Sequence, residues 1–145
     1  MPERSSKLLL ISEVARGAGV NPQTVLFYER RGLIPKAGRR SSGYREFDPE
    51  TVDVIGFIQR AQELGFTLNE ISELLSLRDT DDATCAEVCE RTSQKLRLID
   101  AKIERLRAMR RGLAKLLRLC SAGKRPVDEC VIIQALEKDT VRSTI

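Results

Sequence analysis

Hydrophobic positions in the first third of the chain fall in short segments separated by glycine, proline and asparagine. Ser12 is a suitable N-cap for a short helix that stops at residues 17–19, where two glycines occur. Asn21 and Pro22 then supply an N-cap and a first-turn proline for a second helix, which ends at Gly32. Two short helices joined by a glycine-containing turn are typical of a helix-turn-helix, whose second helix enters the DNA major groove.

The segment that follows, GRRSSGYREF at residues 38–47, has turn residues at its centre and alternates toward Tyr44 and Phe47. This pattern predicts a small β-wing, for which residues 8–10 are a candidate pairing strand. Asp48 and Pro49 follow the wing and are typical of the start of a helix, so we expect a third helix over residues 50–64.

A fourth helix is expected from Thr67, which forms a capping box with Glu70, to about Leu77. Gly65 separates it from the third helix. Two helix pairs with a basic wing fit a DNA-binding head. On these elements alone, a plain protein-interaction module remains an alternative.

The pattern changes to that of one long helix at Thr84, which forms a further capping box with Glu87. Apolar residues follow at spacings of three and four, with Met109 beside the interruption at Arg110. The apolar positions are Leu96, Ile99, Ile103, Leu106, Leu113, Leu117 and Cys120. About 36 residues with a rise of ~1.5 Å make a rod of roughly 54 Å. A seam this long needs a partner helix, so we expect a homodimeric coiled coil.

Composition divides the 145 residues in the same way. All six aromatic residues lie between Phe27 and Phe66, and a compact core needs such bulky side chains. We therefore expect a mainly α protein with a winged helix-turn-helix head at residues 1–78. We expect residues 79–120 to form a linker and a coiled-coil dimerisation helix. Residues 121–145 are expected to form a short metal-binding loop and helix.

Hydrophobic residues make up 41% and charged residues 32% of the chain, which excludes a disordered protein. No run approaches the ~18 apolar residues of a membrane-spanning helix, and the N-terminus lacks the apolar segment of a signal peptide. We therefore expect a cytoplasmic protein with no membrane partner.

Basic charge in the head is concentrated in one stretch of sixteen residues. Its six members are Arg30, Arg31, Lys36, Arg39, Arg40 and Arg45. With glycine, serine and tyrosine among them, they indicate a phosphate-contacting surface. A solvated loop is the alternative on charge alone.

The chain contains no histidine, which excludes Ser-His-Asp and Cys-His catalysis and every metal site that relies on imidazole. It also lacks a nucleotide-binding glycine loop and a recognisable carboxylate pair, so we expect no enzyme. Four cysteines in a reducing compartment are typical of ligands or redox groups rather than structural disulfides.

Cysteine spacing favours a site shared between two chains. Cys85 and Cys120 lie at opposite ends of the expected helix, roughly 50 Å apart, and cannot meet within one chain. Antiparallel pairing of two helices brings Cys85 of one subunit to Cys120 of the other, whereas parallel pairing leaves no mixed site. Cys130 follows ten residues after Cys120, across a loop that can fold back. Three thiolates from two chains would then gather twice per dimer.

Two of these cysteines have a local reason to ionise. Cys85 is in the first turn of its helix, and Cys130 precedes an apolar run that suggests another helix start. An all-sulfur site favours soft or borderline metals, namely Hg, Cd, Pb, Zn or Cu(I). Cys89, one turn from Cys85, is a candidate fourth ligand. The alternatives are buried packing cysteines, or a thiol redox switch in which Cys85–Cys89 or Cys120–Cys130 form disulfides.

Taken together, these segments resemble the MerR family of transcriptional regulators over nearly the whole chain. The segments are TVLFYERRGLIP in the second helix, GYREF in the wing, FIQRAQELGFTLNEISELLSL in the third and fourth helices, and the long helix with its cysteines. The resemblance implies a winged-helix dimer held by an antiparallel coiled coil. It also implies a mechanism in which the promoter spacer between the two elements recognised by RNA polymerase is too long. Metal binding then distorts the DNA of this spacer, so that the polymerase can engage both promoter elements.

The same resemblance assigns DNA contacts to Thr24, Tyr28 and Arg30 in the second helix and to Tyr44 and Arg45 in the wing. Arg40, from the basic cluster, is a further candidate. One departure from the family is Leu26, where an arginine is usual. A DNA contact is therefore missing or moved, which puts the operator specificity in doubt.

The resemblance also bears on the metal. Mercury sensors of the family use three cysteines at positions matching Cys85, Cys120 and Cys130. Lead and cadmium sensors are similar, copper(I) sensors generally lack the first cysteine, and zinc sensors bring a histidine and an additional loop cysteine. We therefore expect Hg(II) as the effector, then Pb(II) or Cd(II), then Zn(II).

Overall fold

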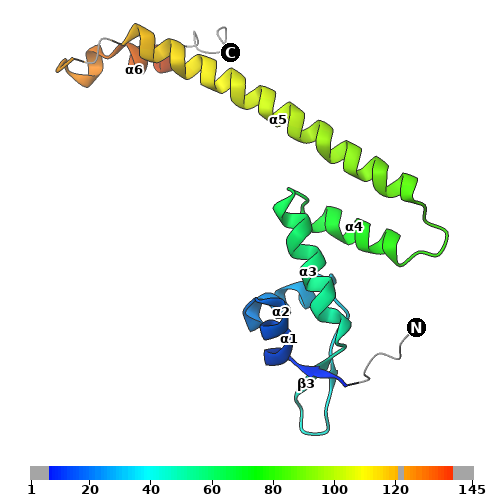
Figure 1. Ribbon diagram of the computed structural model, residues 1–145. Helices are drawn as coiled ribbons and strands as arrows, with labels where there is room; N and C mark the ends of the chain where they lie inside the picture. The colour runs from blue at the N-terminus through cyan, green and yellow to red at the C-terminus, as the bar shows by residue number, and fades with distance from the viewer. Residues whose placement is uncertain (1–6, 121–122, 139–145) are drawn as a thin grey trace. The chain divides into compact units, whose positions relative to one another are not determined.

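The computed structural model describes residues 7–120 and 123–138 of the chain, so residues 121–122 and 139–145 of the expected C-terminal piece lie outside the described residues. The chain divides into two compact units, Met1–Thr92 and Ser93–Ile145. Figure 1 shows their elements, which are mainly helical. In chain order they are β1 (Leu9–Leu10), α1 (Ile11–Ala18), α2 (Pro22–Arg30), β2 (Gly38–Arg39), β3 (Arg45–Phe47), α3 (Glu50–Glu63), α4 (Leu68–Arg78), α5 (Cys85–Leu119), the 3₁₀ helix η1 (Val127–Glu129) and α6 (Val131–Glu137).

The start of α1 differs from the sequence prediction. Leu10 is the N-cap, and its backbone N–H donates to the carboxylate of Glu13 at 3.0 Å, so Ser12 lies inside the helix and the prediction that it is the cap was wrong. Leu10 also ends strand β1, so the chain turns from strand to helix with no connecting residue. The end of α1 agrees with the prediction, because Gly19 is a left-handed C-cap with φ of 70°.

The second helix of the pair begins as predicted. The side chain of Asn21 accepts the backbone N–H of Thr24 at 2.9 Å, and Pro22 occupies the first helical position. Arg31 caps the other end, and Gly32 follows with a positive φ of 72°. The helix-turn-helix predicted from the spacing of asparagine, proline and glycine is therefore confirmed.

A three-stranded antiparallel sheet in the order β1-β3-β2 forms the wing. Leu9 pairs with Phe47, and Arg39 pairs with Arg45. The turn between β2 and β3 closes where the backbone N–H of Arg40 donates to the carbonyl of Tyr44 at 2.8 Å. Both the wing and the predicted N-terminal pairing strand are confirmed.

Helices α3 and α4 begin where the sequence predicts them, and α4 has the predicted capping box. The carboxylate of Asp48 accepts the backbone N–H of Glu50 at 2.8 Å, at the start of α3. Thr67 and Glu70 form a reciprocal capping box at the start of α4, with hydrogen bonds of 2.8 and 3.2 Å. Gly65 lies between the two helices with φ of 93°.

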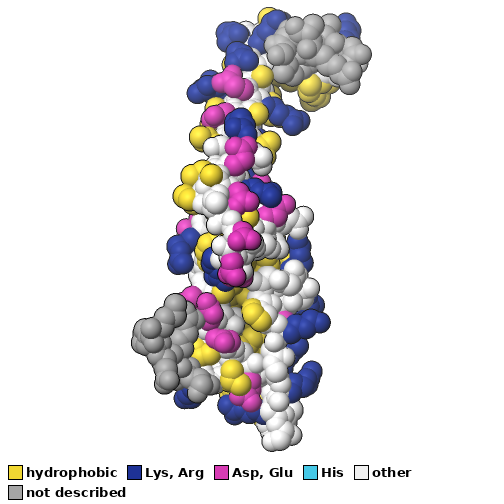
Figure 2. All heavy atoms as spheres, turned by 90° about the vertical axis from the view of Figure 1, so that its right-hand side faces the viewer, with side chains coloured by type: hydrophobic (Ala, Val, Ile, Leu, Met, Phe, Trp, Pro, Cys, Tyr) yellow, Lys and Arg dark blue, Asp and Glu magenta, His cyan; other side chains and the backbone are white. Residues whose placement is uncertain are grey.

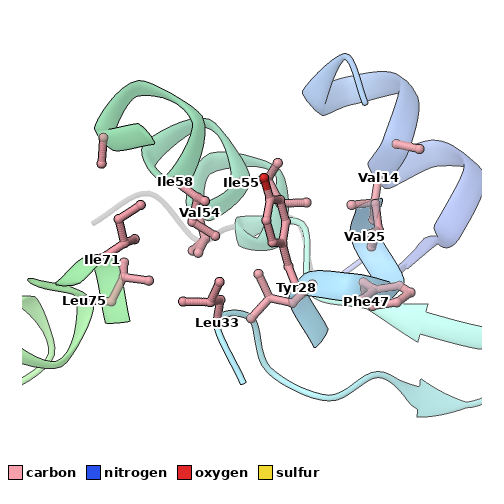
Figure 3. Close-up of a cluster of buried hydrophobic side chains, with 13 residues drawn as sticks. Val14, Val25, Tyr28, Leu33, Phe47, Val54, Ile55, Ile58, Ile71 and Leu75 are labelled. Atoms are coloured by element: carbon pink, nitrogen blue, oxygen red, sulfur yellow. The ribbon is translucent and has the colours of Figure 1, made fainter. Parts of the chain in front are cut away.

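The core of the head joins both helix pairs to the wing (Figure 3). Its fully buried side chains come from α1, α2, β3, α3 and α4, and they are Val14, Val25, Phe47, Thr51, Ile55, Ile58 and Ile71. Burial of the apolar side chains among them is the main favourable term in folding of the head, at about 1.5–3 kcal/mol for each large one.

The long helix α5 is confirmed, and it starts directly after Thr84, whose backbone N–H donates to Glu87 at 2.7 Å. Many of its apolar side chains remain at the surface of the single chain, as Figure 2 shows among the charged ones. The exposed members are Val88, Leu96, Leu98, Ile103, Leu106, Met109, Leu113, Leu117 and Leu119. None of the described helices is long and apolar enough to cross a membrane.

Replacing Ile58, which is fully buried, by alanine is expected to lower the free energy of unfolding by about 2–5 kcal/mol, because the lost side chain leaves a cavity. Leu64→Ala is the matched control: Leu64 follows the same helix but is 69% exposed, so a change below about 0.5 kcal/mol is expected. Urea unfolding at one protein concentration measures both. Equal losses would contradict this description of the core.

Candidate metal centre and DNA-binding surface

Helix α2 presents part of its predicted DNA-binding set to solvent. Arg30 is exposed in the last turn of the helix. Thr24 is half-buried, and its hydroxyl donates to the Asn21 side chain at 3.1 Å. Leu26, where the family has an arginine, is also half-buried.

Tyr28 has a different environment from the other predicted DNA contacts. Its side chain is only 5% exposed and its ring lies within the core of the head (Figure 3). The hydroxyl donates to Gln62 on α3 at 3.1 Å, and burial raises the pKa of the phenol. The structure therefore uses Tyr28 to pack α2 against α3 and offers little of its ring to DNA.

The wing arginines are held by carboxylates. Arg40 pairs with Glu46 at 3.1 Å, and Arg45 pairs with Glu29 at 2.9 Å. Glu29 is 5% exposed and also accepts the backbone N–H of Ala37 at 2.7 Å, so one buried carboxylate ties α2 to the wing. Buried charges of this kind are stable when paired and hydrogen-bonded. Sequence reasoning missed Glu29, since nothing in the pattern distinguishes it from a surface glutamate.

Two residues of the basic stretch have distinct roles. Arg31 donates to Asn69 on α4 at 3.2 Å and lies over the ring of Phe27, which links α2 to the second helix pair. Tyr44 is 66% exposed at the tip of the wing. The wing and the end of α2 thus present exposed basic and aromatic side chains, with two of the arginines fixed in orientation.

Cys85 and Cys89 form a pair on the first turns of α5. They are four residues apart, their sulfur atoms are 3.9 Å apart, and both side chains are exposed. The hydrogen bond to the Cys85 sulfur and electrostatic repulsion from it raise the pKa of the Cys89 thiol. Cys89 therefore keeps its proton to higher pH than an isolated thiol does.

The beginning of α5 packs against the head within the first unit. Cys85 borders an apolar pocket of about 410 Å³, to which Phe57 of α3 and Leu74 of α4 also contribute. Arg91 forms an ion pair with Glu73 on α4. The first turns of α5 therefore border the helix pair α3–α4 through this pocket and this ion pair.

Cys120 and Cys130 form a second pair in the other unit. Cys120 directly follows α5, and its backbone N–H donates to the carbonyl of Leu116 at 3.1 Å. Cys130 is the N-cap of α6, where the backbone N–H groups of Ile133 and Ile132 lower the pKa of its thiol. A hydrogen bond to the Cys120 side chain lowers that pKa further. Both cysteines line a pocket of about 220 Å³.

The four cysteines are therefore brought together as two pairs, Cys85 with Cys89 and Cys120 with Cys130. Among the described residues of one chain, no group of three or more potential ligands of the His, Cys, Asp and Glu types is close enough to hold a metal ion. A site with three or four sulfur ligands requires a second chain. The donor set fits a thiophilic ion, because all four candidates are free thiols and no imidazole is present.

Comparison with known proteins gives consistent results across the chain. A family described as "MerR HTH family regulatory protein" matches residues 9–77, and one described as "MerR, DNA binding" matches residues 52–116. The chain is 45% identical over 128 residues to a mercuric resistance operon regulatory protein of Bacillus cereus, covering 88% of this chain and 96% of that protein.

Two further similarities are relevant. The HTH-type transcriptional regulator ZntR of Escherichia coli strain K12 is 33% identical over 129 residues, with 88% of this chain and 92% of that protein covered. The crystal structure of the transcription regulator PbrR691 from Ralstonia metallidurans CH34 in complex with lead(II) is 35% identical, with a TM-score of 0.80. It covers 88% of this chain and 98% of that one.

The fold and the surface of the head define a winged helix-turn-helix protein that binds DNA. The chain belongs to the MerR family of transcriptional regulators. Its relatives are regulators and not enzymes, which confirms the expectation drawn from the sequence.

In metal-free, reduced protein, Cys130 is expected to react with iodoacetamide at lower pH than Cys89. Alkylation requires the thiolate, which a lowered pKa makes available at lower pH for Cys130 and a raised pKa withholds from Cys89. Peptide mass spectrometry across a pH series measures both midpoints. The same series in urea is the control, where the difference should disappear. Coincident midpoints in the folded protein would contradict the two environments.

Proposed function

We propose that this protein is a metal-responsive transcriptional regulator that binds promoter DNA as an antiparallel homodimer. Each end of the dimer binds a thiophilic ion through Cys85 of one subunit and Cys120 and Cys130 of the partner subunit. Hg(II) is the first candidate for the ion, with Pb(II), Cd(II) and Zn(II) as alternatives. Binding distorts the DNA spacer so that RNA polymerase engages the promoter.

The exposed apolar side chains of α5 support the dimer. Leu96, Leu106, Leu113 and Leu117 are each 59–67% exposed in the single chain and recur with the spacing of a coiled-coil seam. Exposed apolar surface of this extent marks an interaction site. Antiparallel pairing follows from the cysteines, because only this arrangement places Cys85 beside the Cys120–Cys130 pair.

The Cys120–Cys130 pair is the observation that carries the metal proposal. Its two cysteines line one pocket of about 220 Å³, and the start of α6, where Cys130 is the N-cap, lowers the pKa of the Cys130 thiol. A soft divalent ion binds thiolates in preference to oxygen ligands. The similarity to the mercuric resistance regulator supports Hg(II), while the similarity to the lead(II) complex supports Pb(II).

The coupling to DNA follows from the packing at the start of α5. A bound ion holds Cys85 to the partner subunit, and Cys85 borders the pocket that α3 and α4 help to line. The Arg91–Glu73 ion pair joins the same segment of α5 to α4. Movement of Cys85 therefore moves the head, and the energy of DNA bending makes promoter geometry sensitive to the position of the two heads.

DNA contact is assigned to exposed and half-buried side chains of the head. Thr24 and Arg30 on α2 and Arg40, Tyr44 and Arg45 in the wing form this set, and Tyr28 supports it from the core. The ion pairs of Arg40 and Arg45 limit the rotamers of both side chains, which remain partly exposed and can donate hydrogen bonds to phosphate oxygens.

A thiol redox switch on the same scaffold is the second candidate. The 3.9 Å separation of the Cys85 and Cys89 sulfurs favours it, since the two thiols could be oxidised to a disulfide with a small movement. A response to oxidant without a response to metal would select this function.

Cys85→Ser and Cys120→Ser are expected to abolish the metal response while DNA affinity stays within about twofold, because phosphate contacts made by the head supply most of that affinity. Hg(II) binding is followed by ultraviolet charge-transfer absorption under excess small thiol. DNA affinity is measured with a duplex selected by the wild-type protein from a random pool.

Ala86→Ser is the control, since Ala86 is exposed on the same turn of α5 and carries no thiol. A cysteine variant that still responds to metal would show that the site is wrongly assigned. If only Zn(II) or Cu(I) bound tightly, the protein would still be a metal-responsive regulator, but Hg(II) would not be its effector.

Arg30→Ala is expected to weaken binding to the selected duplex and to reduce the slope of log affinity against log salt by about 1, as loss of one phosphate contact does. Arg118→Ala is the charge-matched control, because Arg118 is exposed in the last turn of α5. Affinity is measured by fluorescence anisotropy at several salt concentrations. Equal slopes for wild type and Arg30→Ala would remove Arg30 from the interface.

A further inference from the structure

Cys89 is the one cysteine without a role in the three-sulfur site. Resting on the proposed function, we infer that Cys89 is a fourth ligand, so that each end of the dimer binds one ion between two preformed cysteine pairs. One pair is Cys85 and Cys89 of one subunit, and the other is Cys120 and Cys130 of the partner subunit. The consequence is a site that also accepts four-coordinate ions such as Cd(II).

The geometry of the first pair fits a chelate. Residues four apart on a helix project from the same face one turn apart, and the two sulfurs lie 3.9 Å from each other. In a tetrahedral site with Zn–S bonds of about 2.3 Å, two sulfur ligands are about 3.8 Å apart. Cys85 and Cys89 therefore match two corners of a tetrahedral site with no change in the backbone.

Packing does not explain the pair. Cys85 and Cys89 are both exposed, and neither belongs to the buried core of the head. A structural cysteine is usually among the most buried residues of a protein. Two exposed thiols side by side on one helix face are accessible to an ion and to the second chain.

The second pair supplies the remaining two sulfurs. Cys120 and Cys130 line the same pocket of about 220 Å³, so both sulfurs border one space that an ion can enter. Each chain contains both pairs, so dimer pairing has only to bring one pair from each chain together at each end.

A fourth sulfur changes which ions the site prefers. Four thiolates in tetrahedral arrangement are typical of Zn(II) and suit Cd(II) equally, whereas Hg(II) is satisfied by fewer sulfurs. Loss of Cys89 should therefore weaken binding of the four-coordinate ions much more than binding of Hg(II). This difference distinguishes a ligand from a residue that only neighbours the site.

The test uses the reduced full-length dimer titrated with Cd(II) alone under excess small thiol. The sulfur-to-cadmium charge-transfer absorption per bound ion is proportional to the number of thiolate ligands. Cys89→Ser is therefore expected to lower this absorption by about one quarter, because four sulfur ligands become three. Bound Cd(II) should also protect Cys89 of the wild type from iodoacetamide, as read by peptide mass spectrometry. Ala86→Ser is the matched control and should leave both readings unchanged.

The outcomes separate this inference from the proposed function. Unchanged absorption per Cd(II) in Cys89→Ser, together with loss of binding in Cys85→Ser, would overturn the role of Cys89 and leave the three-sulfur site in place. A wild type that binds neither Cd(II) nor Hg(II) would overturn both. Equal weakening of Cd(II) and Hg(II) in Cys89→Ser would also contradict the inference, because it would indicate a general disturbance of the site.

Discussion

The continuity of α5 is the constraint on which the rest of the protein depends. A helix of 35 residues is about 52 Å long, and Cys85 and Cys120 mark its two ends. No rearrangement of side chains can join them within one chain, so the proposed metal site needs two chains. The same helix leaves a row of leucines at its surface, where the proposed dimer would pair. In this proposal, ligand placement and dimerisation depend on the same helix.

A small number of buried polar contacts hold the elements of the head together. Glu29 holds both the wing, through Arg45, and the segment after α2, through the Ala37 backbone. Tyr28 and its hydrogen bond to Gln62 join α2 to α3. Because these groups are buried, their hydrogen bonds are strong and directional. These contacts consequently connect the wing, α2 and α3 within the head.

The thiols of the candidate site are divided between the two units of the chain. Each unit of the chain contains one pair of thiols, and local backbone geometry sets the character of each pair. Helix-terminal N–H groups stabilise the Cys130 thiolate, while the neighbouring sulfur disfavours ionisation of Cys89. An ion that binds the Cys89 sulfur would have to displace the thiol proton, so binding of the ion would be coupled to release of a proton.

The sequence by itself determined the elements, because caps, glycines and apolar spacing act over a few residues: the Asn21 cap, the Thr67–Glu70 box and the long helix after Thr84 all lie where the pattern predicts them. Most of the candidate site, including the antiparallel cysteine argument, also came from spacing along one rigid helix. The pairing of Cys85 with Cys89 likewise follows from their spacing of four on one helix. Only the tertiary structure decided that Leu10 rather than Ser12 caps α1, that Tyr28 is buried, and that Glu29 holds the wing. These depend on which segments pack together and which rotamers they permit, and no local pattern specifies that.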